Sequence, residues 1–232
     1  MLVCNHLTKK YLTTTAVSNM DLTLELGRVY ALLGPNGSGK TTFMKMAAGL
    51  IKPTSGEITF DGYAIGPQSK AHVAYMPTEA YFFKYMDGRD VGKYYADFFA
   101  DFDKVEYEHL VEHLQLSLND KVRTLSSGMM AKLKLAANLA RNSRLVMLDE
   151  PLNGIDIIAR EQVIDAIVRR ISPERTFLLS SHLVDELEKI VDYAVFMKKG
   201  DVVLQGKTEN LKEQRGKDLV GLYKEIYGGQ EG

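Results

Sequence analysis

The chain contains three short, mostly apolar runs, each followed directly by polar residues or glycine. They are Val29 to Leu33, Leu145 to Leu148 and Thr176 to Leu179. Strands of a parallel sheet carry this pattern because helices cover both faces of the sheet and bury every side chain of the strand. We therefore predict that the three runs form the centre of a mainly parallel sheet.

Two other segments, residues 20–26 and, less regularly, 57–60, alternate apolar and polar residues. This alternation is typical of antiparallel strands that have one face in water. We expect the early part of the chain to form an antiparallel β subdomain. A further short strand is predicted at 200–206, with a glycine at each end.

Apolar residues recur at the spacing of one helix face over residues 157–171, which predicts a helix that joins the second and third apolar runs in a βαβ unit. Its apolar positions are Ile157, Ile164, Ile167, Val168 and Ile171. Residues 90–115 and 127–141 also have a helical pattern, and few strand signals lie between residues 79 and 142. These features predict an inserted, all-helical subdomain and an α/β fold class.

The predicted elements divide the chain into four parts. The first part of an α/β core, with the antiparallel subdomain, takes residues 1–78, and the helical insertion takes 79–142. The second part of the core follows at 143–215. Residues 216–232 form a C-terminal tail in which a weak helix precedes a loose, glycine-rich end.

Composition places the chain among soluble globular proteins, since 45% of its 232 residues are hydrophobic and 25% are charged. Lys and Arg number 29 against 30 Asp and Glu, and no basic block is longer than a lysine pair, so nucleic-acid binding is disfavoured. A single cysteine, Cys4, and no secretory pattern at the start predict a reducing, cytoplasmic location. No apolar stretch approaches the roughly 18 residues that span a bilayer. Another chain must therefore supply any membrane span.

Residues 34–41, GPNGSGKT, match the P-loop pattern G-x-x-x-x-G-K-[ST] between an apolar run and a helical stretch. Glycine lets the backbone approach phosphates, the helix N-terminus offers partial positive charge, Lys40 adds a full charge, and the Thr41 hydroxyl can ligate Mg²⁺. The alternative, a glycine-rich turn without a ligand, is disfavoured by this context. The predicted phosphate-binding residues are Gly34, Asn36, Gly37, Ser38, Gly39, Lys40, Thr41 and Thr42.

Two adjacent carboxylates, Asp149 and Glu150, end the second apolar run. Ligands of open α/β sheets bind at this carboxyl edge of the strands. We expect Asp149 to hold Mg²⁺, directly or through water, and Glu150 to orient and deprotonate a water that attacks the γ-phosphate. The alternative is a solvated acidic pair at the start of a loop, which is less favoured beside a P-loop.

Three further motifs accompany these two elements: LSSGM at 125–129, LNGID at 152–156 and SSH at 180–182. Their order and spacing resemble those of the nucleotide-binding subunit of an ATP-binding cassette (ABC) transporter over roughly residues 1–210. The resemblance implies a P-loop NTPase core that hydrolyses ATP with Mg²⁺. In isolation, Ser126 would be a helix cap, Gly128 a tight turn and His182 a helix-start or core residue.

The resemblance also implies roles for single residues. Tyr11 corresponds to the aromatic residue that stacks on adenine. Ser126 and Gly128 correspond to the signature residues that contact the γ-phosphate bound by the opposite subunit, so each site is split between two cassettes. Asp156 corresponds to the acidic residue of the loop that joins the sites, and His182 to the histidine that reaches the γ-phosphate and, with Lys40 and Glu150, serves catalysis.

The sequence departs from the family at two positions. Thr78 stands where the family usually has Gln, and Glu79 follows it. Either side chain could meet the metal or its water, so we place Glu79 with Thr41 and Asp149 as predicted metal ligands and leave Thr78 open. Met129 replaces the signature Gln. This is similar to cassettes of ABC-2-type permeases, commonly exporters of drugs, peptides, lipids or polysaccharides.

Nine of the chain's 21 Tyr and Phe residues lie within residues 81–102. The simpler interpretation, which suits most of them, is the core of the helical subdomain. The family resemblance implies a groove there that receives a short helix of the membrane subunit. Exposed aromatic side chains are natural interface anchors. The candidates nearest the Gln position are Tyr81, Phe82, Phe83 and Tyr85.

These observations together predict an ATPase subunit that powers transport through a separate permease. It would act with a second cassette, identical or related, at the cytoplasmic face of the cell membrane, without nucleic acid. The alternative within the family is a soluble ATPase of assembly or remodelling. A DNA-repair ATPase needs a long coiled-coil insertion, a translation factor needs two cassettes, and a P-loop kinase or GTPase would lack the LSSGM motif.

Overall fold

A six-stranded sheet forms the centre of the computed structural model, which describes residues 1–228. Its strands, in spatial order, are β10 (Asp201–Lys207), β9 (Tyr193–Lys198), β3 (Val29–Leu33), β8 (Thr176–Ser181), β7 (Leu145–Asp149) and β6 (Val73–Met76). All neighbours pair in parallel except β10 and β9, which are antiparallel. The three predicted apolar runs lie side by side at the centre, which confirms a mainly parallel sheet.

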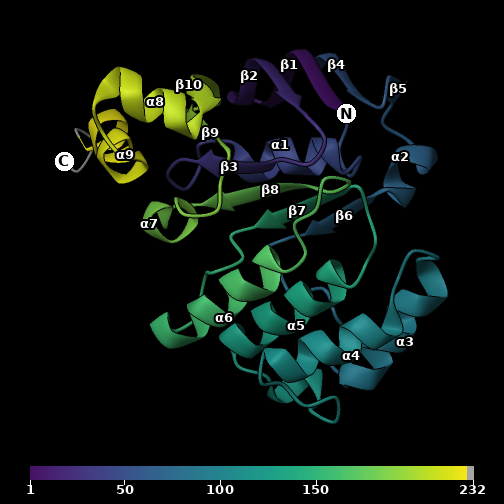
Figure 1. Ribbon diagram of the computed structural model, residues 1–232. Helices are drawn as coiled ribbons and strands as arrows, with labels where there is room; N and C mark the ends of the chain where they lie inside the picture. The colour runs from purple at the N-terminus through teal and green to yellow at the C-terminus, as the bar shows by residue number, and fades with distance from the viewer. Residues whose placement is uncertain (229–232) are drawn as a thin grey trace.

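A second, antiparallel sheet lies above the first, with α1 between them (Figure 1). Its strands, in spatial order, are β2 (Thr14–Leu24), β1 (Leu2–Tyr11), β4 (Ser55–Phe60) and β5 (Tyr63–Ala64). This sheet confirms the predicted antiparallel N-terminal β subdomain.

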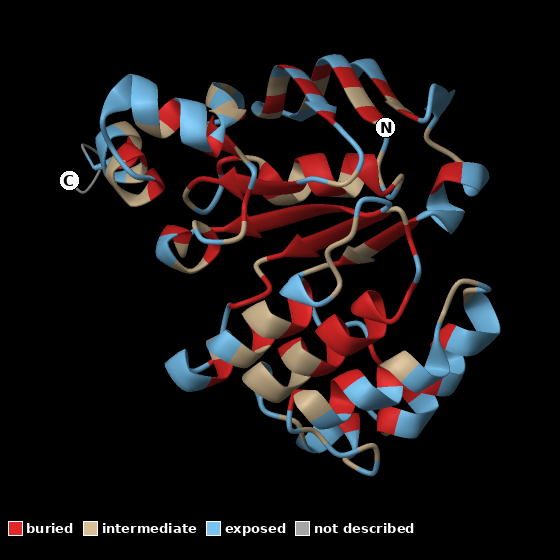
Figure 2. Ribbon diagram, viewed as in Figure 1, coloured by how far each residue is buried: buried red, intermediate tan, exposed pale blue. Residues whose placement is uncertain are grey.

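The central strands are buried on both faces, as their apolar runs predict. Val29, Ala31 and Leu33 pack into the core on the side of the helical insertion. Tyr30 and Leu32 pack into the core that α1 shares with the antiparallel sheet. Figure 2 shows these strands as an almost continuous buried layer. The strand ends therefore have a firm support on both sides.

Helices occupy three places around the sheets (Figure 1). Next to the central sheet or the edge of the antiparallel one are α1 (Lys40–Ala47), α2 (Pro67–Ala71), α6 (Ile157–Val168) and α7 (Val184–Leu187). The insertion holds α3 (Gly88–Phe98), α4 (Lys104–His113), the 3₁₀ turn η1 (Val122–Thr124) and α5 (Ser127–Leu139). The C-terminal pair is α8 (Thr208–Arg215) and α9 (Leu219–Tyr227). Within residues 1–228, none of the helices is long and apolar enough to cross a membrane.

Two expectations need refinement, and part of a third falls on residues that the structure does not describe. Residues 90–115 form two helices, because Phe99 adopts an extended backbone and the Asp103 carboxylate caps a new helix through the Glu106 amide. The predicted apolar stripe of 157–171 is only partly buried, since the side chains of Ile157 and Val168 are exposed. The glycine-rich end of the predicted tail, residues 229–232, lies outside the described residues.

Candidate functional site

A cavity of about 710 Å³, which we call the P-loop cavity, lies at the carboxyl ends of the central strands. The loop between β3 and α1 forms its floor, and the β1–β2 turn and the loops after β6, β7, β8 and β9 form its walls. Its lining residues are Tyr11, Thr14, Thr15, Ala16, Asn36, Gly37, Ser38, Gly39, Lys40, Thr41, Thr42, Thr78, Glu150, Asn153, His182 and Lys199.

The P-loop takes its shape from glycine and from the start of α1. Gly39 has a left-handed backbone (φ 108°), and a side chain there would collide with the carbonyl oxygen of Ala16. The buried Lys40 ammonium curls back over the loop and donates to the carbonyl oxygens of Gly34 at 2.6 Å and Pro35 at 3.3 Å. The first amides of α1 thus face the cavity beside a fixed cation, which suits an anionic ligand.

The Glu150 carboxylate links the cation of the P-loop to the loop after β8. One of its oxygens lies 3.4 Å from Lys40 Nζ, and the other lies 2.9 Å from His182 Nδ1. The oxygen that faces Lys40 is buried and makes no hydrogen bond to any described residue. The Glu150 side chain is only 9% exposed, whereas that of His182 is 41% exposed. The structure therefore brings all three predicted catalytic residues together.

Asp149 lies one residue deeper, at the end of β7, and is fully buried. It accepts a hydrogen bond from the Ser180 hydroxyl at 2.6 Å and a longer one from the Tyr75 hydroxyl at 3.4 Å. Burial, and then the charge of Asp149, raise the pKa of Tyr75 well above its usual value, so Tyr75 stays a neutral donor. The same Ser180 hydroxyl also accepts a hydrogen bond from the backbone N–H of Glu150. Ser180 therefore orients the Asp149 carboxylate and holds the backbone of Glu150.

The residues present fit a magnesium ion that is coordinated partly by protein oxygens and partly by the phosphates of a bound nucleotide. Mg²⁺ in nucleotide sites is held by one or two protein oxygens together with phosphate and water. Thr41 lines the P-loop cavity, whereas Asp149 precedes Glu150, is fully buried and does not line the cavity itself. Residues 1–228 hold no cluster of three or more His, Cys, Asp or Glu suited to a metal, so protein donors alone would leave its coordination incomplete. Ser38 Oγ, buried and unpaired among the described residues, lines the same cavity.

Thr78 and Glu79, the two candidates for the position where the family usually has Gln, lie in different surroundings. Thr78 lines the P-loop cavity, and Glu79 does not. Glu79 is 61% exposed, and its carboxylate pairs with Lys45 Nζ at 2.9 Å. That hydrogen bond lowers the pKa of Glu79. The geometry thus favours Thr78 over Glu79 at this position, and a metal role for Glu79 has no geometric support.

Ser126, Gly128 and Asp156 do not line the P-loop cavity of their own chain. Ser126 caps α5 by accepting the Met129 amide at 3.2 Å, and Asp156 caps α6 by accepting the Ala159 amide at 3.0 Å. Both side chains are nonetheless exposed. A side chain on Gly128 would lie 2.9 Å from the Gly154 carbonyl oxygen, so the LSSGM and LNGID motifs pack directly together.

Tyr11 and Gly34 are the remaining predicted site residues. Tyr11 is 46% exposed in the P-loop cavity, with Lys9 Nζ 5.1 Å from its ring centroid. Gly34 precedes the cavity-lining part of the P-loop.

Five cavity residues were not predicted from the sequence: Thr14, Thr15, Ala16, Asn153 and Lys199. Only Asn153 lay within a recognised motif, and the turn after β9 that carries Lys199 had no signal because β9 itself was not predicted.

Comparison with known proteins agrees with the geometry. A family model described as ABC transporter matches residues 17–153. The lantibiotic transport ATP-binding protein SrtF of Streptococcus pyogenes is 32% identical over 218 residues, which cover 92% of this chain and 95% of that protein. The Nod factor export ATP-binding protein I of Cupriavidus pinatubonensis is 31% identical over 225 residues, covering 93% and 69%.

A solved structure, described as the ATP-binding subunit of an ABC transporter, superposes with a TM-score of 0.87 at 25% identity. The match covers 97% of this chain and 99% of that one. The cassette MJ0796, solved as a dimer bound to ADP and phosphate, shares the fold with a TM-score of 0.80 at 19% identity. With the family model matching more than half of the chain and relatives matching almost all of it, this chain belongs to the ABC transporter family, as an ATP-binding subunit that hydrolyses ATP to power transport.

Proposed function

We propose that this subunit hydrolyses Mg·ATP at sites shared with a second cassette and passes the energy to a separate permease. The observation that carries the proposal is the position of the Glu150 carboxylate, between Lys40 Nζ and His182 Nδ1 at the edge of the P-loop cavity. A carboxylate held there has a cation on one side and a partly exposed imidazole on the other. It is placed to take a proton from a water at the outermost phosphate.

Each predicted residue of the P-loop cavity and its surroundings has a defined task in the proposed reaction. The P-loop amides and Lys40 bind the β- and γ-phosphates, and Thr41 and Asp149 are the residues that would hold Mg²⁺, which neutralises charge on those phosphates when bound. Glu150 orients and deprotonates water. His182, hydrogen-bonded to Glu150, fixes the carboxylate and reaches toward the γ-phosphate. Tyr11 offers its exposed ring to the adenine.

The second cassette is needed because Ser126 and Gly128 do not line the P-loop cavity of their own chain. We propose that the helical insertion, residues 79–142, presents them to the nucleotide held by the opposite cassette. The ATP-binding core then comprises residues 1–78 and 143–215, and residues 216–232 are a C-terminal tail. Asp156, exposed at the start of α6, lies in the loop that would join the two sites.

The permease is proposed to dock beside a second cavity of about 360 Å³, which we call the aromatic cavity. Its lining residues are Ala48, Leu50, Lys70, Val73, Tyr75, Pro77, Tyr81, Tyr94, Tyr95, Phe99, Asn138 and Arg141. Among the predicted anchors, Phe83 and Tyr85 are exposed and stacked 5.5 Å apart, and Tyr81 is partly exposed. Phe82 is buried in the core, so it is excluded as an anchor.

Docking of this kind makes the protein peripheral on the cytoplasmic face of the membrane. The named relatives transport a lantibiotic or export a Nod factor. Together with the Met129 signature, they support export by an ABC-2-type permease for this chain.

The test mixes two inactive variants. Ser126→Arg places bulk and charge in the shared interface, and Lys40→Ala removes the phosphate cation; each alone should lose turnover. A heterodimer of the two has one site with both lesions and one with neither, so activity should return on mixing. Wild-type activity should also rise faster than linearly with concentration while monomer predominates. Linear dependence, with an active Ser126→Arg monomer, would refute the shared site.

A further inference from the structure

A buried lysine in the middle of α5 contacts the segment that separates the two cavities. The Lys134 side chain is almost fully buried, at 4% residue exposure. Its ammonium donates to the carbonyl oxygens of Pro77 at 2.7 Å, Thr78 at 2.8 Å and Glu79 at 3.2 Å. An ammonium has three N–H donors, and all three are used on consecutive residues of one loop.

One turn further along α5, Asn138 holds the other end of the same segment. Its side-chain amide donates to the Tyr81 hydroxyl at 2.9 Å and to the Lys134 carbonyl oxygen at 2.8 Å. The Tyr81 hydroxyl in turn lies 2.8 Å from that of Tyr95. Residues four apart share one helix face, so a single face of α5 holds residues 77–81 at both ends.

The held segment lies between the P-loop cavity and the aromatic cavity. Thr78 lines the first cavity, together with Lys40 and Glu150. Pro77 and Tyr81 line the second. The five residues 77–81 therefore connect the wall of the P-loop cavity to the wall of the aromatic cavity.

The Lys134 ammonium donates three hydrogen bonds to the loop, although it is buried. Desolvation lowers the pKa of Lys134, although the charges of Glu79 and Asp149 oppose that shift. Among the described residues its ammonium has no carboxylate within ion-pair distance, and an apolar side chain of similar length would fill the same space without the cost of burying a charge. What an apolar side chain could not do is hold three carbonyl groups of the loop in place.

We propose that Lys134 is a positioning residue for ATP hydrolysis: it fixes residues 77–81 so that Thr78 reaches the reacting end of the nucleotide while Tyr81 reaches the permease. This inference rests on the proposed function of the P-loop cavity. It gives the segment, which lacks the usual Gln, a rigid support from the helix that carries the signature motif. Lys134 acts through Thr78 and does not touch the nucleotide.

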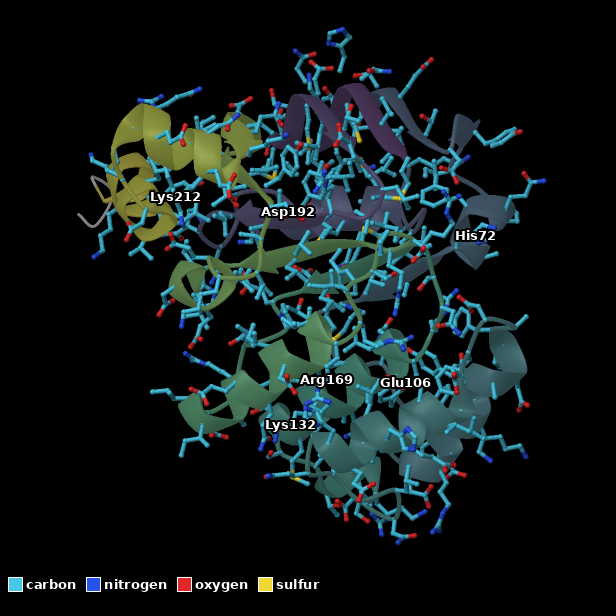
Figure 3. The ribbon with its side chains drawn as sticks, viewed as in Figure 1. His72, Glu106, Lys132, Arg169, Asp192 and Lys212 are labelled. Atoms are coloured by element: carbon cyan, nitrogen blue, oxygen red, sulfur yellow. The ribbon has the colours of Figure 1, made fainter. Side chains whose placement is uncertain are left out.

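The experiment compares Lys134→Met with Lys132→Met in the isolated cassette. Lys132 lies on the same helix, among the helices of the insertion (Figure 3), and donates to the Leu114 carbonyl oxygen at 3.1 Å, so it controls for loss of a lysine from α5. We expect kcat of Lys134→Met to fall about 10–150-fold, the equivalent of one hydrogen bond to a charged group, with ATP affinity unchanged. The amides of residues 78–81 should exchange faster with deuterium. Lys132→Met should match wild type in both measurements.

A double-mutant cycle then tests the route of the effect. If Lys134 acts through Thr78, adding Lys134→Met to Thr78→Ala should change kcat little further. Wild-type kcat and exchange rates in Lys134→Met, or fully additive losses in the double variant, would overturn the inference.

Tyr81→Phe replaces Lys134→Met in the exchange experiment if Lys134→Met does not fold. It removes only the hydroxyl that Asn138 holds, and unchanged amide exchange at residues 78–81 would then count against the inference. An inactive wild type with an inactive Lys132→Met would instead refute the proposed function.

Discussion

Replacing Glu150 with Gln removes one negative charge and leaves the shape of the P-loop cavity almost unchanged. The Glu150 amide keeps its bonds to Ser180, because they involve only the backbone of residue 150. The two side-chain atoms that face Lys40 and His182 remain within reach of both. The variant should therefore fold normally, and any loss of turnover reports the chemistry of the carboxylate.

The expected loss of turnover follows from the chemistry of the Gln side chain. Its amide group cannot accept a proton from water, and general-base assistance contributes about 10²–10⁴-fold in rate, or about 3–5 kcal/mol of barrier. ATP binding should be unchanged or tighter, since Lys40 Nζ, 3.4 Å from Glu150 in the structure, loses an anionic competitor of the phosphates. A bound nucleotide that is not hydrolysed should also hold the two cassettes together.

Three measurements on one preparation check this reasoning. Phosphate release gives kcat, titration with a fluorescent ATP analogue gives affinity, and gel filtration with and without ATP gives the oligomeric state. Glu186→Gln is the matched control, because Glu186 is also a partly buried carboxylate paired with a cation, Arg160 at 3.5 Å, and does not line the P-loop cavity. Wild-type turnover in Glu150→Gln, or an equal loss in Glu186→Gln, would refute the assignment of Glu150 as the base.

Three further substitutions or reactions test other parts of the structure. Lys40→Ala should weaken ATP binding about 10–150-fold, the effect of losing a charged hydrogen bond of about 1.5–3 kcal/mol, and equal binding of a fluorescent ATP analogue would refute the P-loop assignment. Tyr11→Ala should weaken ATP binding by about 0.5–1.5 kcal/mol but leave inorganic triphosphate binding unchanged, as measured by calorimetry; a loss for both ligands would exclude adenine stacking. Burial raises the pKa of Cys4 to about 12, so its thiol should resist iodoacetamide at pH 8 until the protein unfolds, and its contribution to stability should fall as the pH rises above 9; rapid labelling of folded protein would contradict this.

The central sheet and the phosphate loop could be predicted because their signals are local. An apolar run such as Val29 to Leu33 has to be buried on both faces, and the glycines that follow it allow only a few backbone conformations. β9 escaped prediction although its four inner residues are as buried as those of β3. Its run begins and ends with polar positions, Tyr193 and Lys198, and only pairing with β3 and β10 defines it as a strand.

Contacts between distant segments explain what sequence reasoning could not assign. Thr78 and Glu79 both carry oxygens, and their order along the chain does not say which one faces the phosphates. The choice depends on Lys45, which takes the Glu79 carboxylate toward solvent, and on Lys134, which holds the loop from a position 57 residues away. In the sequence, Lys134 stands between two apolar residues of a helix and resembles a solvated side chain. Its contact with the three carbonyl groups of Pro77, Thr78 and Glu79 holds the loop that carries Thr78 into the wall of the P-loop cavity, and no local pattern in the sequence encodes a contact over this separation.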